Sequence, residues 1–131
     1  MSSILVTDSD DTMCDLLKVR LSGQGYDVFI AQDGLQGLKT YEKVKPKLVI
    51  MDLMLPAMNG YQLIRTIKNK DRGECKIIVL SGGRNENEIE RCFDLGAADY
   101  IRKPFSPIEL EARIRKQLEP FENTAKMEEL V

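Results

Sequence analysis

Four short apolar runs in this sequence each end in polar side chains that could take part in chemistry. These side chains are Asp8, Ser9, Asp10 and Asp11 after the first run, then Asp52, Ser81 and Lys103 after three later runs. Clustered carboxylates repel one another unless a cation lies between them, and Mg²⁺ prefers oxygen ligands. A lysine and a hydroxyl beside them could bind the oxygens of a phosphoryl group. The residue types therefore indicate a site for a divalent cation and for phosphoryl transfer.

The segments that must position these residues alternate between strand and helix patterns. We expect strands at residues 4–7, 26–31, 47–52, 75–81 and 98–102, each followed by apolar side chains at helical spacing. The third run, KLVIMD, has little polar interruption, which is typical of a strand covered on both faces. This alternation predicts an α/β fold with a parallel sheet and helices on both of its faces.

Two helix starts and one helix end have recognisable signals. Asn85-x-x-Glu88 has the form of a capping box, in which side chains and backbone of the first turn bond to each other. Residues 106–109, SPIE, combine the same spacing with a proline at the first helical position. Pro120 is expected to end the last helix, because proline lacks the N–H that the helix interior requires.

The four polar groups are all predicted to lie at one edge of the sheet. Parallel sheets of this kind bind ligands beyond the carboxyl ends of their strands, which is where these residues fall. Asp52 is the most isolated acid and follows the most buried strand, so it is the natural nucleophile. Each residue also has a simpler explanation. The first acids could cap a helix, Asp52 could cap a turn, Ser81 could be a loop hydroxyl and Lys103 could be solvated.

Length and composition limit what kind of protein this can be. The chain has 131 residues, 43% hydrophobic and 31% charged, which suits a single globular domain. We expect residues 1–119 to form that domain and residues 120–131 to be a tail or the start of a linker. A net charge of −2 gives no reason to expect direct binding to nucleic acid or to an anionic membrane. The chain lacks a bilayer-spanning apolar run and a signal-peptide pattern, so a cytoplasmic location is expected.

The sequence around these polar groups resembles the receiver domain of two-component response regulators, and within that family the chemotaxis regulator. The likeness covers about residues 3–118. It rests on the acidic cluster, LVIMDLMLPAMNGYQLI around Asp52, IIVLSG containing Ser81 and GAADYIRKPF containing Lys103. The Asp-x-x-x-Pro-x-x-x-Gly spacing from Asp52 to Gly60 is highly specific when Lys-Pro-Phe follows at this distance. The resemblance implies a flavodoxin-like sheet in the order 2-1-3-4-5, flanked by five helices.

The resemblance also implies roles for individual residues. Asp52 would accept a phosphoryl group from a histidine kinase or a phosphotransfer protein, which fits the absence of histidine from this chain. Asp8 and Asp52 would bind Mg²⁺ together with the backbone carbonyl of Met54. Lys103 would pair with the phosphoryl oxygens, and its peptide bond to Pro104 is expected to be cis. Such a protein is a regulatory phosphoacceptor and not an enzyme, apart from its own phosphorylation and dephosphorylation.

A switch between two arrangements is implied as well. Ser81 would turn its hydroxyl onto the phosphoryl group, which leaves room for Tyr100 to swing inward. Phosphorylation would thereby alter the surface formed by the fourth helix, the fifth strand and the fifth helix. The expected reader of that surface is a downstream protein or a missing output domain.

One position departs from the family pattern. The family has two adjacent acids after the first strand, and here the second acid position is occupied by Ser9. A neutral hydroxyl in place of a carboxylate is expected to weaken the binding of Mg²⁺. Asp10 could compensate as a ligand, or it could simply cap the helix. A receiver that binds partners with little or no phosphorylation is therefore an alternative function.

The first acidic cluster fits a second phosphoryl-transfer family. The run from Asp8 to Thr12 has the D-x-D-x-T form of haloacid-dehalogenase-type phosphatases, in which the first aspartate, here Asp8, is the nucleophile. Those enzymes carry further acids at a strand end after the lysine, whereas the predicted strands of this chain end before any such position. This remote alternative would also leave Asp52 and its specific surroundings without a role.

Overall fold

The expected parallel sheet is confirmed. The computed structural model describes residues 2–83 and 85–129. Its strands are β1 (Ser3–Thr7), β2 (Asp27–Ala31), β3 (Leu48–Asp52), β4 (Lys76–Ser81) and β5 (Asp99–Arg102). They pair in parallel in the order β2-β1-β3-β4-β5, so the expected topology is correct.

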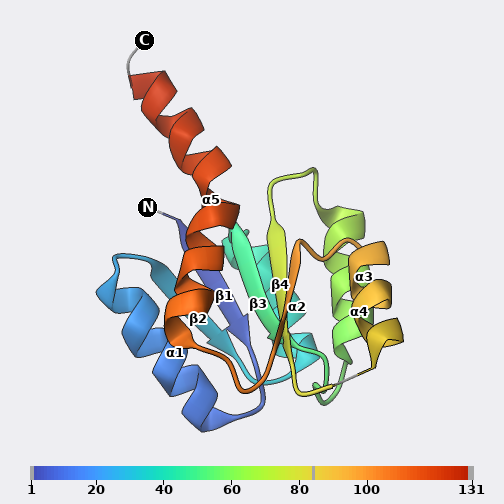
Figure 1. Ribbon diagram of the computed structural model, residues 1–131. Helices are drawn as coiled ribbons and strands as arrows, with labels where there is room; N and C mark the ends of the chain where they lie inside the picture. The colour runs from blue at the N-terminus through green and yellow to red at the C-terminus, as the bar shows by residue number, and fades with distance from the viewer. Residues whose placement is uncertain (1, 84, 130–131) are drawn as a thin grey trace.

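The helices cover both faces of this sheet. They are α1 (Asp11–Gly23), α2 (Gly34–Val44), α3 (Gly60–Lys70), α4 (Glu86–Asp94) and α5 (Pro107–Glu129). Figure 1 shows α1 and α5 in front of the sheet, with α2, α3 and α4 on its other side. None of the helices in the described part of the chain combines the length and the apolar character that crossing a membrane requires.

Two apolar cores lie on the two faces of the sheet. Leu5 and Val49 point to the face where Leu63 and Ile67 of α3 are buried. The residues next to them in β1 and β3 point to the opposite face, against α1 and α5. Because successive side chains of a strand alternate between faces, a strand buried on both sides must be apolar throughout. This requirement explains the unbroken apolar runs of the sequence.

Polar side chains cap the helices that begin near the carboxyl edge of the sheet. Asp10 is the N-cap of α1 and accepts hydrogen bonds from the backbone N–H groups of Thr12 and Met13. Asn85 caps α4 by accepting a bond from the N–H of Asn87. The expected capping box does not form, because the Asn85 side chain accepts the N–H of Asn87 and not that of Glu88, and the Glu88 carboxylate bonds to side chains of β4 and β5.

The expected end of the last helix at Pro120 is wrong. Helix α5 continues to Glu129 with Pro120 inside it. A proline in a helix interior costs about 3 kcal/mol, since it removes a backbone hydrogen bond and crowds the preceding turn. The next residue, Phe121, packs against the core beside α1 and α5, and Lys47 Nζ lies 5.2 Å from the centre of its ring. These contacts stabilise the helical position of Phe121 and offset part of that cost.

A close contact between α2 and the segment after β3 gives a first testable prediction. A Cβ atom added at Gly34 would lie 1.9 Å from the backbone oxygen of Met58, so Gly34→Ala requires the backbone to move. We expect this substitution to lower the free energy of unfolding by about 2 kcal/mol. Gly23→Ala is the matched control, because a Cβ there meets nothing within 4 Å. Urea unfolding followed by circular dichroism compares the two variants, and equal losses would contradict the prediction.

Candidate functional site

The structure brings three of the predicted site residues into direct contact at the carboxyl edge of the sheet. Asp8 follows β1, Asp52 is the last residue of β3, and Lys103 follows β5. Lys103 Nζ donates hydrogen bonds of 2.8 Å to Asp8 Oδ2 and of 2.8 Å to Asp52 Oδ2. Groups that are distant in the sequence therefore form one charged cluster, as the carboxyl-edge argument predicts. The peptide bond between Lys103 and Pro104 is cis.

Burial makes the electrostatics of this cluster strong. The side chains of Asp8, Asp52 and Lys103 are 4%, 15% and 20% exposed. Burial by itself lowers the pKa of Lys103, but hydrogen bonds and charges from Asp52 and Asp8 outweigh it, so the pKa lies above 10.5. The lysine is therefore fully protonated at neutral pH. Two carboxylates and one ammonium group leave a net charge of about −1 in the cluster, which favours an additional cation.

Backbone groups orient both carboxylates. Asp8 Oδ1 accepts a bond of 2.9 Å from the N–H of Asp10, and Asp52 Oδ1 accepts one of 3.0 Å from the N–H of Met54. In each carboxylate the second oxygen is the one that binds Lys103. This turn geometry is common for aspartate after a strand, and it fixes the rotation of the side chain. The two carboxylates are thus presented to a common point.

The other residues of the first polar cluster do not join the contact of Lys103 with Asp8 and Asp52. Ser9, at the position where the family has its second acid, is exposed. Asp10 is also exposed, and its Oδ1 bonds to the first turn of α1 as a helix cap. Asp11 accepts a hydrogen bond from the side chain of Gln32. The capping explanation that the sequence left open therefore describes the position of Asp10 in this structure.

The oxygen ligands at this edge suit a hard divalent cation such as Mg²⁺. Among residues 2–83 and 85–129, no group of three or more His, Cys, Asp or Glu side chains is arranged to hold a metal ion. Asp8 and Asp52 are two carboxylates, and Mg²⁺ in proteins is often held by one or two carboxylates with several retained waters. Met54 has a side chain that is 80% exposed, and its N–H is bonded to Asp52. The residues present therefore fit a magnesium ion that keeps much of its water.

Ser81 and Tyr100 are joined by a residue that the sequence analysis did not assign to the site. Ser81 Oγ donates a hydrogen bond of 3.1 Å to Glu88 Oε2, and it accepts one of 3.1 Å from the N–H of Gly83. Tyr100 donates its hydroxyl to the same oxygen of Glu88. Burial and this carboxylate raise the pKa of Tyr100 to about 12, so the phenol remains a donor. The spacing to Asn85 had suggested only a helix cap for Glu88.

The exposed position of Ser9 leads to a prediction about metal binding. Ser9→Asp would place a third carboxylate next to Asp8, and we expect it to raise the affinity for Mg²⁺ by about tenfold. Asp10→Asn is the control and should leave the affinity nearly unchanged, because Asn can also cap a helix. Isothermal titration calorimetry with MgCl₂ measures all three proteins. No gain on restoring the acid would show that Ser9 does not limit metal binding.

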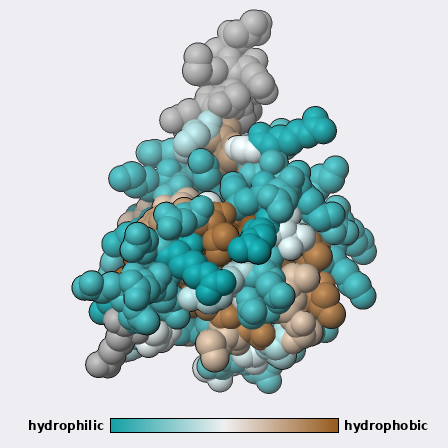
Figure 2. Space-filling model, turned by 90° about the vertical axis from the view of Figure 1, so that its right-hand side faces the viewer, coloured by the Kyte–Doolittle hydropathy of each residue, from teal (hydrophilic) through white to brown (hydrophobic). Residues whose placement is uncertain are grey.

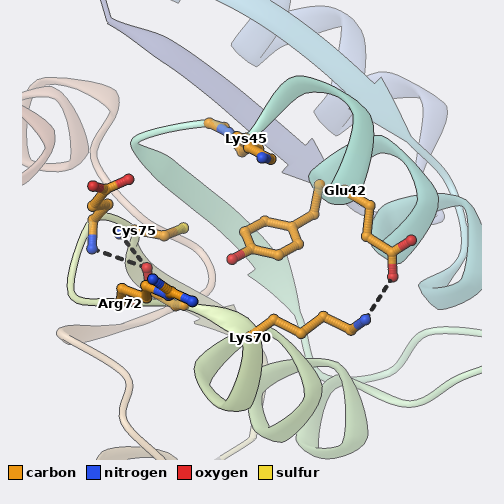
Figure 3. Close-up of a pocket in the computed structure, with 9 residues that line it drawn as sticks. Glu42, Lys45, Lys70, Arg72 and Cys75 are labelled. Atoms are coloured by element: carbon orange, nitrogen blue, oxygen red, sulfur yellow. Dashed lines mark hydrogen bonds and ion pairs between the residues drawn. The ribbon is translucent and has the colours of Figure 1, made fainter.

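A separate pocket lies at the opposite edge of the sheet. Figure 3 shows this cavity of about 510 Å³, whose lining includes Glu42 and Lys45 before β3, and Lys70, Arg72 and Cys75 before β4. Lys70 and Glu42 form an ion pair of 3.2 Å across it. Because its residues precede the strands, the pocket is on the far side of the sheet from Asp52. It is therefore not part of the carboxyl-edge cluster.

Comparison with known proteins identifies sequence relatives of this chain. A family model described as the response regulator receiver domain matches residues 4–115. The DNA-binding response regulator MtrA of Mycolicibacterium paratuberculosis is 39% identical over 115 residues, which cover 88% of this chain and 50% of that protein. The probable transcriptional regulator ycf27 of Porphyridium aerugineum is 41% identical over 115 residues, covering 88% and 47%. The chain thus spans about half the length of the curated relatives that it matches.

Solved structures with the same fold cover nearly the whole chain. A CheY-like response regulator receiver domain protein from Methanospirillum hungatei is 30% identical, with a TM-score of 0.88 over 95% of this chain and 98% of that chain. The BeF3-activated N-terminal receiver domain of RstA from Klebsiella pneumoniae is 28% identical, with a TM-score of 0.83 over 88% and 97%. The flavodoxin-like arrangement expected from the sequence is therefore correct.

Proposed function

This chain belongs to the response regulator receiver domain family of two-component systems, and from that premise we propose that Asp52 is its phosphoacceptor. The domain is regulatory and is not a classical enzyme. The observation that carries the proposal is the position of Lys103, which bonds to Asp52 and Asp8 at 2.8 Å each. An ammonium group held against an oriented, partly exposed carboxylate can neutralise the charge of an incoming phosphoryl group.

The proposed transfer uses the carboxylate as a nucleophile. An oxygen of Asp52 attacks phosphorus on a phosphohistidine of the donor protein, and a new P–O bond forms. The P–N bond breaks, and its electron pair stays on the histidine nitrogen of the donor. Lys103 then exchanges its bond to the Asp52 oxygen for one to a phosphoryl oxygen. The backbone N–H of Met54 keeps the carboxylate in its orientation during this exchange.

Receiver domains of this family typically use Mg²⁺. In this chain, Asp8 and Asp52 would hold the ion together with the backbone carbonyl of Met54. The ion would supply positive charge to the phosphoryl oxygens. The exposed Ser9 at the second acid position supports weaker binding than in a receiver with two adjacent acids.

We infer that the phosphorylated state is read at the surface formed by α4, β5 and α5. Ser81 and Tyr100 are the proposed switch residues, and they connect the carboxyl edge to α4 and β5. Phe93 on α4 and Ile108 on α5 are 45% and 71% exposed apolar side chains, which could contact a partner. Figure 2, which faces the side carrying α3 and α4, shows apolar patches within a mostly hydrophilic surface. A coupling free energy of about 1–3 kcal/mol is the ordinary scale for such a switch.

The proposed partners are a histidine kinase or phosphotransfer protein, and an output domain or a downstream protein. Relatives of this chain are named DNA-binding response regulators, and the chain matches only half of their length. The sequence-based expectation of no direct nucleic-acid contact is therefore restricted to these 131 residues, whose net charge is −2. Binding of DNA by a longer protein would belong to its output domain.

The decisive experiment maps the residue that acetyl phosphate modifies, with and without MgCl₂. We expect a single acyl phosphate on Asp52 that hydroxylamine cleaves and that forms faster with Mg²⁺. Borohydride reduction followed by peptide mass spectrometry identifies the modified aspartate. Modification of Asp8 would favour the phosphatase alternative. No modification under either condition, with intact binding of a partner, would favour an interaction module that works without phosphorylation.

A further inference from the structure

Glu88 connects the two proposed switch residues. It lies in the first turn of α4, while Ser81 ends β4 and Tyr100 is in β5. One oxygen, Glu88 Oε2, accepts the hydroxyl of Ser81 at 3.1 Å and also the hydroxyl of Tyr100. The side chains of three separate elements therefore meet at a single carboxylate. Hydrogen bonds to a charged acceptor are stronger than those between neutral groups.

The missing side chain of Gly83 makes room for this carboxylate. A Cβ atom added at Gly83 would lie 2.3 Å from Glu88 Oε2 and 2.8 Å from Glu88 Oε1. The N–H of Gly83 also donates a bond of 3.1 Å to Ser81 Oγ, so this short segment packs closely around both residues. By contrast, a Cβ at the neighbouring Gly82 meets nothing within 4 Å. The position of the Glu88 carboxylate thus depends on the absence of a side chain at Gly83 and not at Gly82.

We propose that Glu88 is a positioning residue that holds Ser81 and Tyr100 in the unphosphorylated arrangement and so opposes the switch. This inference rests on the proposed function, in which the Ser81 hydroxyl binds a phosphoryl group on Asp52. A serine hydroxyl carries one proton, so Ser81 cannot donate it to Glu88 and to a phosphoryl oxygen at once. Phosphorylation must therefore break the bond between Ser81 and Glu88 before the switch is complete.

The same carboxylate restrains Tyr100. While its hydroxyl donates to Glu88, the phenol is tied to the first turn of α4, and inward movement requires this bond to break. Movement of Ser81 and of Tyr100 each removes a hydrogen bond from the partly buried Glu88 carboxylate, which then has to find water or another donor. Removal of Glu88 should accordingly lower the free energy of the switched state relative to the resting state.

The test measures the affinity of the full chain for beryllofluoride, a phosphoryl analogue, at saturating MgCl₂. Glu88→Ala removes the carboxylate, and Gly83→Ala displaces it without altering its chemistry. We expect beryllofluoride to bind about tenfold more tightly to Glu88→Ala and about threefold more tightly to Gly83→Ala. Glu90→Ala, at an exposed position of the same helix, and Gly82→Ala are the matched controls. Both controls should keep the affinity of the wild type within about twofold.

A second measurement separates positioning from a general effect on stability. The ring signals of Tyr100 in NMR spectra, assigned with Tyr100→Phe, report its environment without beryllofluoride. We expect Glu88→Ala and Gly83→Ala to shift these signals toward those of the beryllofluoride-bound wild type, whereas the two controls leave them in place. Glu88→Gln keeps an acceptor oxygen and should give intermediate values in both measurements.

The possible results distinguish this inference from the function on which it rests. Wild-type protein that binds beryllofluoride at Asp52, with equal or weaker binding by both Glu88→Ala and Gly83→Ala, would overturn the role of Glu88 and leave the proposed function intact. Wild-type protein that does not bind beryllofluoride at Asp52 would overturn the proposed function, and the inference with it. Tighter binding by the two variants together with shifted Tyr100 signals supports both.

Discussion

Asp52→Asn is expected to abolish uptake of a phosphoryl group from acetyl phosphate. The amide has no negative charge and is a very poor nucleophile, so the acyl phosphate cannot form at this position. The fold should be retained, because asparagine can still accept the N–H of Met54 and Lys103 keeps its bond to Asp8. Intact-protein mass spectrometry or a phosphate-affinity gel measures the uptake.

Two further variants make this result specific. Asp10→Asn changes an acid of the first cluster that caps α1, and it should take up phosphate at nearly the wild-type rate. Asp8→Asn removes a proposed metal ligand and should slow the uptake without moving it to another residue. Persistent labelling of Asp52→Asn, together with loss of labelling in Asp8→Asn, would contradict the assignment of the phosphoacceptor.

Lys103→Met should be the most destabilising single change at the site. It leaves the Asp8 and Asp52 carboxylates, 4% and 15% exposed, without the ammonium group that both contact. Removal of one partner from a buried charge cluster typically costs 3–5 kcal/mol, and we expect about 3 kcal/mol here because the site is partly open to solvent. Urea unfolding at neutral pH measures the loss. The variant should also take up phosphate more slowly, since the charge that binds the phosphoryl oxygens is absent.

Magnesium and pH test the cause of this loss. Added MgCl₂ should restore part of the stability of Lys103→Met, because the ion can neutralise the same two carboxylates. The raised pKa of Lys103 means that its stabilising contribution is complete below pH 10.5 and decreases as the pH rises through its folded-state value. Lys18→Met, at an exposed position on α1, is the matched control. Equal unfolding free energies for the two variants would show that the cluster does not need its ammonium group.

Local patterns were sufficient to predict a parallel α/β sheet and the edge at which the charged residues meet. The run from Leu48 to Met51 is apolar because both faces of the strand are buried, and this property can be seen without coordinates. Once five such runs alternate with helices, the rules for parallel sheets leave few topologies. The family resemblance then selected the order of the strands. Asp8 and Asp52 follow neighbouring strands in that order, whereas β5 is separated from β3 by β4, so the long side chain of Lys103 has to reach across the carboxyl edge to contact both.

Tertiary contacts decided the points at which sequence patterns were wrong or incomplete. Pro120 does not end α5, and packing of Phe121 against the core offsets part of the cost of a proline inside the helix. Glu88 has the spacing of a capping residue, but its carboxylate bonds to Ser81 and Tyr100 instead.

The sequence by itself determined the order and type of the strands and helices, apart from the continuation of α5 beyond Pro120, and which edge of the sheet carries the acids and the lysine. Periodicity and strand direction are properties of short segments, so they can be read from the residues alone. Only the tertiary structure decided which donor each side chain meets, as at Asp10 and Glu88. A flexible polar side chain can reach several donors, and the one that it binds depends on segments brought beside it by the whole fold.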